Sequence, residues 1–281
     1  MESLLSFQIS TQDLHIPKPR KKSLGEIKAE DIVDALERCV GVNTLDLSQY
    51  QFGLEGIKIV AKALLKYQGT LALDLSSNNI RSDGLAHLIE ALFRMKLLRE
   101  LNLSNNFLGM KGIAHMEKLL PKLHNLQFLD LSSNYIGFEG AMALGKCIGS
   151  LFSLKILNIS DNYLYDAGLV FIALGFKNYQ GLNIISIKNN QITTMSLRFL
   201  LEKLRSQKSL KMVEFYDNKN WEALSRAFWL ESVGMVGIQA DGPNLEFCNK
   251  CKRYCDKKLC EWSRRRPICT FRSLSKSYKL I

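Results

Sequence analysis

The chain has 281 residues, of which 47% are hydrophobic, and it carries a net charge of +11. It contains no apolar run near the roughly 20 residues that a membrane-spanning helix needs, and its N-terminus lacks the pattern of a secretory signal. Its seven cysteines are unevenly spaced, which argues against the disulfide framework of a small secreted domain. We therefore expect no transmembrane segment and a cytoplasmic location, with a nuclear or a cytoskeletal and ciliary location as alternatives.

Two segments precede the regular part of the chain. Residues 1–22 are predicted to be a flexible basic arm, because they combine mixed polarity with Pro17, Pro19 and a basic cluster at residues 18–22. Residues 23–41 are predicted to form a capping helix, since Ile32, Val33 and Leu36 fall on one helical face. Such a helix would close the N-terminal end of the array that follows, whose core would otherwise be open to water.

A pattern of 28 residues recurs seven times from residue 42 onwards. In the copy at residues 126–140, Leu129 and Leu131 alternate with Asp130 and Ser132, which is the period of a short strand. Steps of 28 from Leu129 lead to six further apolar residues: Leu45, Leu73, Leu101, Leu157, Ile185 and Val213. A fixed period in this range predicts a solenoid of strand–turn–helix units over residues 42–243, with about seven repeats and a degenerate C-terminal cap.

An asparagine follows the strand in six of the seven copies. Asn134 has counterparts at Asn78, Asn106, Asn162, Asn190 and Asn218, and only Tyr50 departs from the series. The turn out of a strand leaves backbone groups that no sheet ladder satisfies. We therefore expect these Asn side chains to be buried and hydrogen-bonded to the backbone.

The recurring pattern LxxLxLxxNxLxxxG resembles the intracellular, ribonuclease-inhibitor-like class of leucine-rich repeats. The resemblance implies an α/β horseshoe with a parallel β-sheet on the concave face and helices on the convex face. It also implies a non-catalytic scaffold that binds another protein on the concave face and rim, needs no cofactor and is a monomer when unbound. Ran GTPase activation is a remote alternative, because the functional residues of that family cannot be placed on this chain.

Strand residues that point away from the helices would line the concave face, where one column holds four large apolar side chains. Tyrosines at the turns and after the last repeat strand are expected to form the adjacent rim. The candidate partner-binding residues are Phe128, Ile156, Ile184, Met212, Tyr135, Tyr163, Tyr165 and Tyr216. Two alternatives stay open: the C-terminal tail covers this surface, or the aromatic side chains pack into their own loops.

Residues 244–281 are a basic, Cys-rich tail, because residues 245–281 hold eleven Lys or Arg against three acidic residues, a net charge of +8. The cysteine spacing predicts an amphipathic helix followed by a disordered end. The weaker alternative is a zinc site made of Cys248, Cys251, Cys255 and Cys260. The basic residues that would bind nucleic acid, a ribonucleoprotein, a microtubule or an anionic membrane surface are Lys252, Arg253, Lys257, Lys258, Arg264, Arg265 and Arg266.

One motif approaches a nucleotide-binding loop without completing it. Gly140, Gly145 and Lys146 have the spacing of a P-loop, but Cys147 stands where a Ser or Thr hydroxyl must bind magnesium. Gly140 also belongs to the glycine series of the repeats. No histidine accompanies a nucleophile at a repeat position that would assemble a catalytic pair. We expect neither enzyme activity nor a cofactor.

Overall fold

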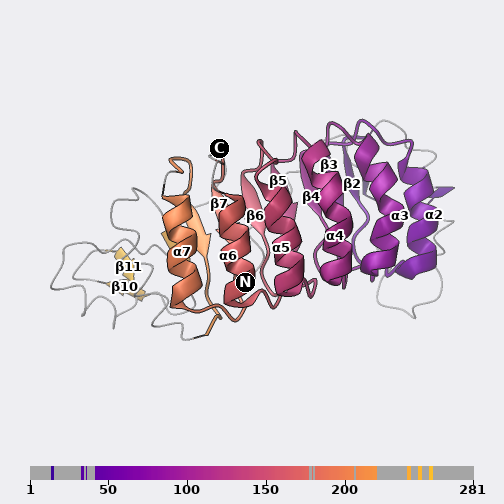
Figure 1. Cartoon of the computed structure of the whole chain (residues 1–281). Helices are drawn as coiled ribbons and strands as arrows, with labels where there is room; N and C mark the ends of the chain where they lie inside the picture. Colours follow the sequence, from indigo (N-terminus) through magenta and orange to yellow (C-terminus); the bar gives the residue numbers. More distant parts are fainter. Residues whose placement is uncertain are drawn as a thin grey trace.

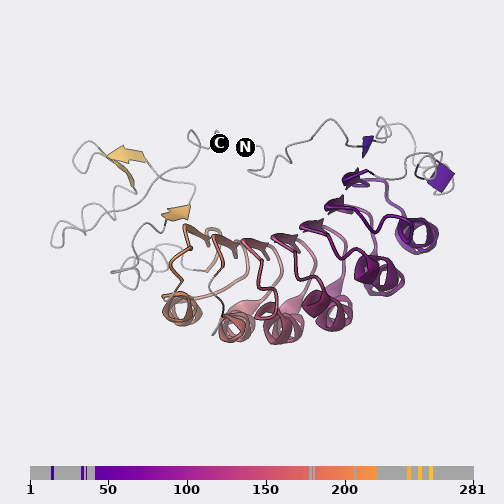
Figure 2. The ribbon, with the colours of Figure 1, turned by 90° about the horizontal axis from the view of Figure 1, so that it is seen from above.

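Residues 42–219, apart from 177, 178, 180 and 206, are described by a computed structural model, as are Val33, Asp34 and Leu36 and the backbone of short strands at 14–15, 239–241, 246–248 and 253–255. Within this part, nine strands form one parallel sheet in the order of the chain. Helices cover one face of the sheet (Figure 1). Seen from above, the array is curved, with the strands on the inner side and the helices on the outer side (Figure 2). The predicted horseshoe is confirmed.

The strands of the large sheet are short and evenly spaced in the chain: β1 (Leu14–His15), β2 (Thr44–Asp46), β3 (Ala72–Asp74), β4 (Glu100–Asn102), β5 (Phe128–Asp130), β6 (Ile156–Asn158), β7 (Ile184–Ser186), β8 (Met212–Glu214) and β9 (Gln239–Asp241). Helices connect β2 to β8: α2 (Gly53–Leu64), α3 (Arg81–Arg94), α4 (Gly109–Leu119) with the 3-10 turn η1 (Leu120–Lys122), α5 (Gly137–Ile148), α6 (Tyr165–Gly175) and α7 (Thr194–Leu204). None of the helices in the described ranges is long and apolar enough to cross a bilayer.

The middle residue of each strand from β2 to β8 points into the core between sheet and helices. Leu129, for example, pairs with Leu101 on one side and Leu157 on the other, and all three are fully buried. Parallel strands cannot be joined by a tight turn, so each repeat needs a crossover, and the helix supplies both that connection and the opposite wall of the core. A single unit therefore buries its apolar face only by stacking on its neighbours.

The turn asparagines form a continuous buried series, which we call the asparagine ladder. The Nδ2 of Asn134 donates to the carbonyl oxygens of Leu103 and Leu131 at 2.9 and 3.0 Å. Its Oδ1 accepts from the backbone N–H groups of Asn106 and Leu108 at 3.0 and 3.3 Å. Each side chain thus ties its own turn to the preceding repeat, and the pattern is shared by Asn106, Asn162, Asn190 and Asn218. The expected role of these residues is confirmed.

The N-terminal arm prediction is wrong for two residues. Leu14 and His15 form β1 and pair with Leu45 and Asp46 of β2. An unpaired sheet edge exposes a row of backbone donors and acceptors, and even a two-residue strand satisfies part of that row. The other residues of the predicted arm lie outside the described part of the chain.

The predicted tail helix is also wrong where the structure describes the tail. Residues Glu246–Cys248 (β10) and Arg253–Cys255 (β11) form an antiparallel pair, with Phe247 opposite Tyr254. Aromatic residues favour strands, whereas cysteine is among the weaker helix formers. The remaining tail residues lie outside the described ranges, and the domain limits at residues 243 and 244 stay predictions.

Helix α7 begins differently from the helices α2 to α6, because its N-cap residue Thr193 is extended and its hydroxyl accepts from the Met195 N–H; its repeat also has Ser196 in place of the usual glycine. The carboxylate of Asp166, in α6, accepts hydrogen bonds from the Thr193 backbone N–H at 2.7 Å, from the Thr193 hydroxyl at 2.8 Å and from the Ser196 hydroxyl. Burial alone would raise the pKa of Asp166, but these hydrogen bonds and the charge of Lys219 outweigh it and lower the pKa. Asp166 thus anchors Thr193, the N-cap residue of the helix in the next repeat.

Replacing Asp166 with Asn should lower the free energy of unfolding at pH 7 by about 1–2 kcal/mol, because a neutral amide replaces the charged acceptor of three hydrogen bonds. Because the folded pKa is depressed, the stabilisation by Asp166 is present above the unfolded value of about 4 and is lost as the pH falls through the folded pKa. Urea unfolding at neutral pH and near pH 3 measures both effects, and the gap between the two proteins should shrink at the lower pH. Asp161→Asn is the control, since that carboxylate accepts an exposed hydrogen bond from Asn189. If the difference in free energy of unfolding between the wild type and Asp166→Asn did not change with pH, the lowered pKa of Asp166 would not be the source of the stabilisation.

Candidate functional site

The first residues of the strands form a column on the concave face. The sheet register brings Phe128, Ile156, Ile184 and Met212 together on adjacent strands, as their spacing predicted. Their expected exposure is wrong for two of the four, because Phe128 keeps 7% and Met212 only 2% of its accessible surface. Ile156 and Ile184 are half-buried. Strands lie only about 4.8 Å apart, so a large side chain is largely covered by its neighbours, and this column offers little apolar surface.

In the middle of the neighbouring column, from Asp74 to Asn158, carboxylates and amides alternate. The Asn102 Nδ2 donates to Asp74 Oδ2 at 3.0 Å, and the Asn158 Nδ2 donates to Asp130 Oδ2 at 2.8 Å. Burial raises the pKa of Asp74 and of Asp130, although hydrogen bonds from the following serines and from these amides act in the opposite direction. The column is therefore a hydrogen-bonded, partly anionic floor beside the rim.

A charged pair lies at the C-terminal end of the concave face. The Lys188 Nζ is 3.1 Å from Glu214 Oε2 and 5.0 Å from the centroid of the Tyr216 ring. Burial would lower the pKa of Lys188, but Glu214 and Tyr216 outweigh this effect and raise it, so the amine stays protonated. The sequence prediction included Tyr216 and missed both charged neighbours. Comparing the columns of adjacent strands would have shown one cation and one anion side by side.

The exposed aromatic surface lies at three consecutive turns, one residue after the ladder asparagines Asn106, Asn134 and Asn162. Phe107, Tyr135 and Tyr163 retain 46%, 55% and 45% of their accessible surface. Their rings are stacked, with centroids 5.7 and 5.6 Å apart and planes inclined by 12° and 18°. We call these three residues the aromatic rim. Tyr165, also exposed, lies two residues beyond Tyr163, and its ring centroid is 5.9 Å from the Lys219 Nζ.

The backbone holds the aromatic rim in an unusual conformation. Phe107, Tyr135 and Tyr163 all have positive φ angles, between 55° and 56°. Bulky side chains rarely occupy this left-handed region, which costs roughly 1–2 kcal/mol per residue. The same repeat position is Asn79 in one neighbouring unit and Gln191 in another, with the same sign of φ. The asparagine ladder fixes the turn whatever residue follows, and it therefore imposes this conformation on the aromatic residues.

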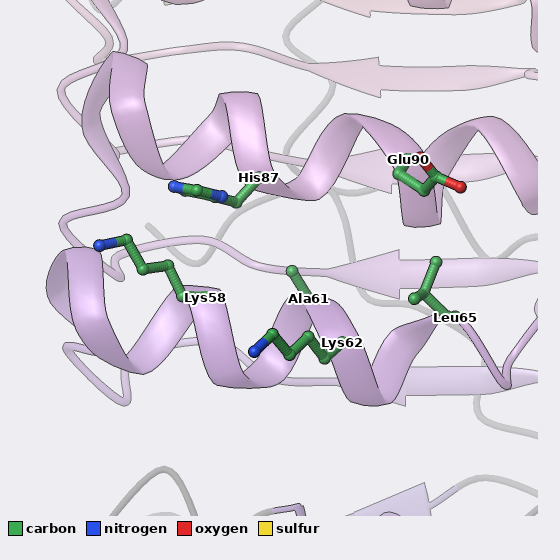
Figure 3. A pocket seen from close by; sticks show the side chains of 6 residues that line it. All are labelled: Lys58, Ala61, Lys62, Leu65, His87 and Glu90. Atoms are coloured by element: carbon green, nitrogen blue, oxygen red, sulfur yellow. The ribbon is translucent and has the colours of Figure 1, made fainter.

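The convex side holds a shallow pocket of about 360 Å³ between α2 and α3. Figure 3 shows Lys58 and His87 near one end and Leu65 and Glu90 near the other, with Lys62 between them. The amine of Lys58 is paired with Glu55 at 2.7 Å. The lining combines scattered charges with an apolar floor and brings no nucleophile next to a base, so it does not indicate a catalytic centre.

The P-loop-like motif is part of a helix. Gly140, Gly145 and Cys147 all lie within α5, so the backbone there cannot form a phosphate-binding loop. Burial raises the pKa of the Cys147 thiol to about 12, which disfavours the nucleophilic thiolate. Among the described residues, no group of three or more His, Cys, Asp or Glu side chains is placed to hold a metal ion.

Of the predicted tail residues, three lie in the part of the chain that the structure describes. Cys248, Arg253 and Cys255 belong to β10 and β11, of which only the backbone is described. The other residues of the predicted zinc site and basic surface lie outside the described ranges: Cys251, Cys260, Lys252, Lys257, Lys258, Arg264, Arg265 and Arg266. Zinc binding and binding of nucleic acid by the tail therefore stay predictions.

Comparison with known proteins identifies the repeats. The sequence matches the family described as leucine-rich repeat over residues 71–88, 122–145 and 150–173. No curated protein matches the chain. One of the solved structures that match is the crystal structure of a TLR13–ssRNA13 complex, with 18% sequence identity, a TM-score of 0.44 and coverage of 77% of this chain. This chain spans 30% of the length of that protein. The family match and the parallel, helix-covered sheet together show that the chain carries leucine-rich repeats and folds as an α/β leucine-rich-repeat solenoid.

Proposed function

We propose that the protein is a non-catalytic, cytoplasmic scaffold that binds another protein along the aromatic rim and the adjoining concave face. Leucine-rich repeats generally mediate protein–protein interaction, and solenoids present extended concave surfaces for it. The observation that carries the proposal is the exposed stack of Phe107, Tyr135 and Tyr163. In the finer assignment, the repeats are of the ribonuclease-inhibitor-like class, which the 28-residue offset between paired strands supports.

The aromatic rim is exposed and conformationally unfavourable, and this supports a role in binding. Its rings are exposed and its backbone is held in a conformation that suits Asn better, so neither burial nor backbone preference explains aromatic residues at this position. Such conformational cost is commonly found at functional sites. Aromatic side chains are also the residues that contribute most to binding energy in protein interfaces. Stacking reduces the entropy that the rings would lose on binding, because each ring is already restrained by its neighbour.

We assign different roles to the predicted partner-binding residues according to the exposure of their side chains. Tyr135, Tyr163 and Tyr165 are exposed and available as anchors. Ile156 and Ile184 are half-buried on the sheet, and we include them as the part of the surface on the concave face. Phe128 and Met212 are proposed to support this surface from below rather than to contact the partner.

The test replaces rim residues with those that the protein itself carries at the same repeat position. Tyr135→Asn and Tyr163→Gln copy Asn79 and Gln191, so the double variant should fold and be at least as stable as the wild type. We expect it to bind its partner at least about tenfold more weakly. The partner is first isolated from native extract treated with nuclease, and the affinity is then measured with the two purified proteins.

The control removes an exposed aromatic residue elsewhere. Phe152 is exposed in the loop between α5 and β6, and Phe152→His copies His124 at the same repeat position. This variant should bind the partner as tightly as the wild type. If the rim variant and the wild type bind every isolated partner equally well, the aromatic rim is not the site. If binding instead disappears with residues 245–281, the basic tail carries the interaction.

A further inference from the structure

Helix α6 has an outer face without a single charge. Its solvent-facing residues Ala167, Val170, Phe171 and Leu174 recur at helical spacing, and all but the half-buried Val170 are exposed. The opposite face, including Leu169 and Ile172, is fully buried in the core. The helix is therefore apolar on both faces, a composition that is typical of a helix covered on all sides.

At the first and last of these four positions, the other helices of the described part carry a charged residue in nine of ten cases, and Met195 of α7 is the exception. The first and last of the four are Glu55 and Lys62 in α2, Asp83 and Glu90 in α3, Lys111 and Lys118 in α4, Glu139 and Lys146 in α5, and Met195 and Glu202 in α7. Position in the repeat therefore does not demand an apolar residue. The neutral face of α6 is a property of this one helix and needs its own explanation.

Neighbouring helices enlarge this apolar surface. Phe138 and Met142 are exposed on α5, and Met195 is exposed on α7. Figures 1 and 2 show α5, α6 and α7 side by side on the convex side of the array. We call the outer sides of these three helices the convex apolar face. A contiguous exposed apolar surface on a soluble protein commonly marks an interface.

The charges at the edges of the convex apolar face are complementary under a two-fold rotation. An axis parallel to α6 would place α6 against its copy in parallel and α5 against α7 of the other chain. Lys146 and Glu202 occupy the same repeat position, two repeats apart, and would then face each other at the same height. Arg198 lies one helical turn from the position equivalent to Glu139. Both edges would thus pair opposite charges, while the uncharged centre creates no repulsion.

The available area is sufficient for a weak dimer. Three helices about 16 Å long and about 10 Å apart offer roughly 500 Å² per chain, or about 1,000 Å² for the pair. This value lies at the lower limit for specific interfaces. A reversible association that depends on protein concentration is therefore expected, rather than an obligate dimer.

We propose that the convex apolar face is a self-association surface, through which two copies of the chain form a two-fold dimer with parallel α6 helices. The proposal replaces the monomer implied by the family resemblance. It leaves the concave face of both copies free, since the strands lie on the opposite side of the repeats from α6 (Figure 2). The dimer would present two partner-binding surfaces facing away from each other.

Sedimentation velocity of the full chain over concentrations from about 1 to about 300 µM tests the proposal. The double variant Phe171→His, Leu174→Lys copies His115 and Lys118 of α4, so each repeat position already accommodates its new residue. We expect this variant to raise the dimer dissociation constant at least about tenfold. Leu97→Asn copies Asn125 and removes an exposed apolar residue away from the face, so it should leave the constant unchanged.

Charge reversal tests the arrangement of the two copies. Lys146→Glu and Glu202→Lys should each weaken the dimer about threefold to tenfold, and their combination should restore it to within about twofold. Failure of the combination to restore would overturn the parallel arrangement. A wild-type chain that stays monomeric at every concentration would overturn self-association. Binding of another protein that only the α6 variant abolishes would then assign the face to that protein. The rim variant Tyr135→Asn, Tyr163→Gln should dimerise normally, which separates this result from the proposed function.

Discussion

Replacing Asn134 with Leu is expected to lower the free energy of unfolding by about 3–5 kcal/mol, a large effect for one substitution. The side chain is fully buried and serves two backbone carbonyl oxygens and two backbone N–H groups that lie too deep for water to reach. Leucine has the same number of side-chain heavy atoms and the same branching but satisfies none of them. Each buried backbone group left without a partner costs about 1–3 kcal/mol, and relaxation of the turn recovers only part of the sum. Urea unfolding followed by circular dichroism measures the difference.

The variant Asn134→Asp tests the loss of the hydrogen-bond donors alone, because aspartate has nearly the same size and shape as asparagine. A carboxylate can still accept from Asn106 and Leu108, but it cannot donate, and it would face the carbonyl oxygens of Leu103 and Leu131. We expect a loss at neutral pH at least as large as for Leu, with partial recovery in acid when the carboxyl becomes protonated. Asn125→Ala is the control, because that exposed side chain makes one bond to the Lys96 carbonyl. It should change the stability by about 0.5 kcal/mol or less. If Asn134→Leu were equally mild, the ladder would not stabilise the fold.

Replacing Gly145 with Ala is expected to lower the free energy of unfolding by about 2–3 kcal/mol. An added Cβ would lie 2.4 Å from the Phe171 carbonyl oxygen, which is backbone of α6 and cannot turn aside. A Cβ added at Gly175 would lie just as close to the Gly145 carbonyl oxygen, so α5 and α6 pack backbone to backbone. Alanine favours a helix by about 1 kcal/mol over glycine, but separating two packed helices costs more. Packing therefore outweighs helix propensity at this position.

Gly69→Ala is the matched control for Gly145→Ala. An added Cβ at Gly69 would meet no atom within 4 Å, so this substitution should be neutral or slightly stabilising. Thermal or urea unfolding of the two variants and the wild type measures both changes in stability. A Gly145→Ala protein more stable than the wild type would show that α5 and α6 can separate without cost. The result also bears on the convex apolar face, because the close packing of these helices brings Met142 and Phe171 into one surface.

The repeat architecture could be predicted because its signals are local. Each unit contains its own alternating strand, its turn asparagine and its helical pattern, and a constant period forces equivalent residues into register. The burial of Asn134 followed from the same logic, since a strand end leaves backbone groups that need partners. The columns of the concave face were predictable for the same reason: residues separated by one period must be neighbours.

Exposure was not predictable from those columns. Phe128 and Ile156 occupy the same column and were expected to be equally accessible, yet Phe128 is buried and Ile156 is half-buried. Accessibility depends on the size of the neighbouring side chains and on the curvature of the sheet, which a single position in the pattern does not contain. The hydrogen bonds between Asp166 and Thr193 at the start of α7 likewise join residues about one repeat apart, and no local sequence motif predicts them.

The sequence by itself determined a leucine-rich-repeat solenoid with a buried asparagine ladder, because period and polarity are properties of the chain. Only the tertiary structure decided which aromatic rings stack on the rim, that their backbone is held at positive φ, and that α6 presents an uncharged face to solvent. It also replaced the expected tail helix with the β10–β11 pair where the tail is described. These features arise from contacts between units and between strands, and their energies depend on neighbours that the one-dimensional pattern does not specify.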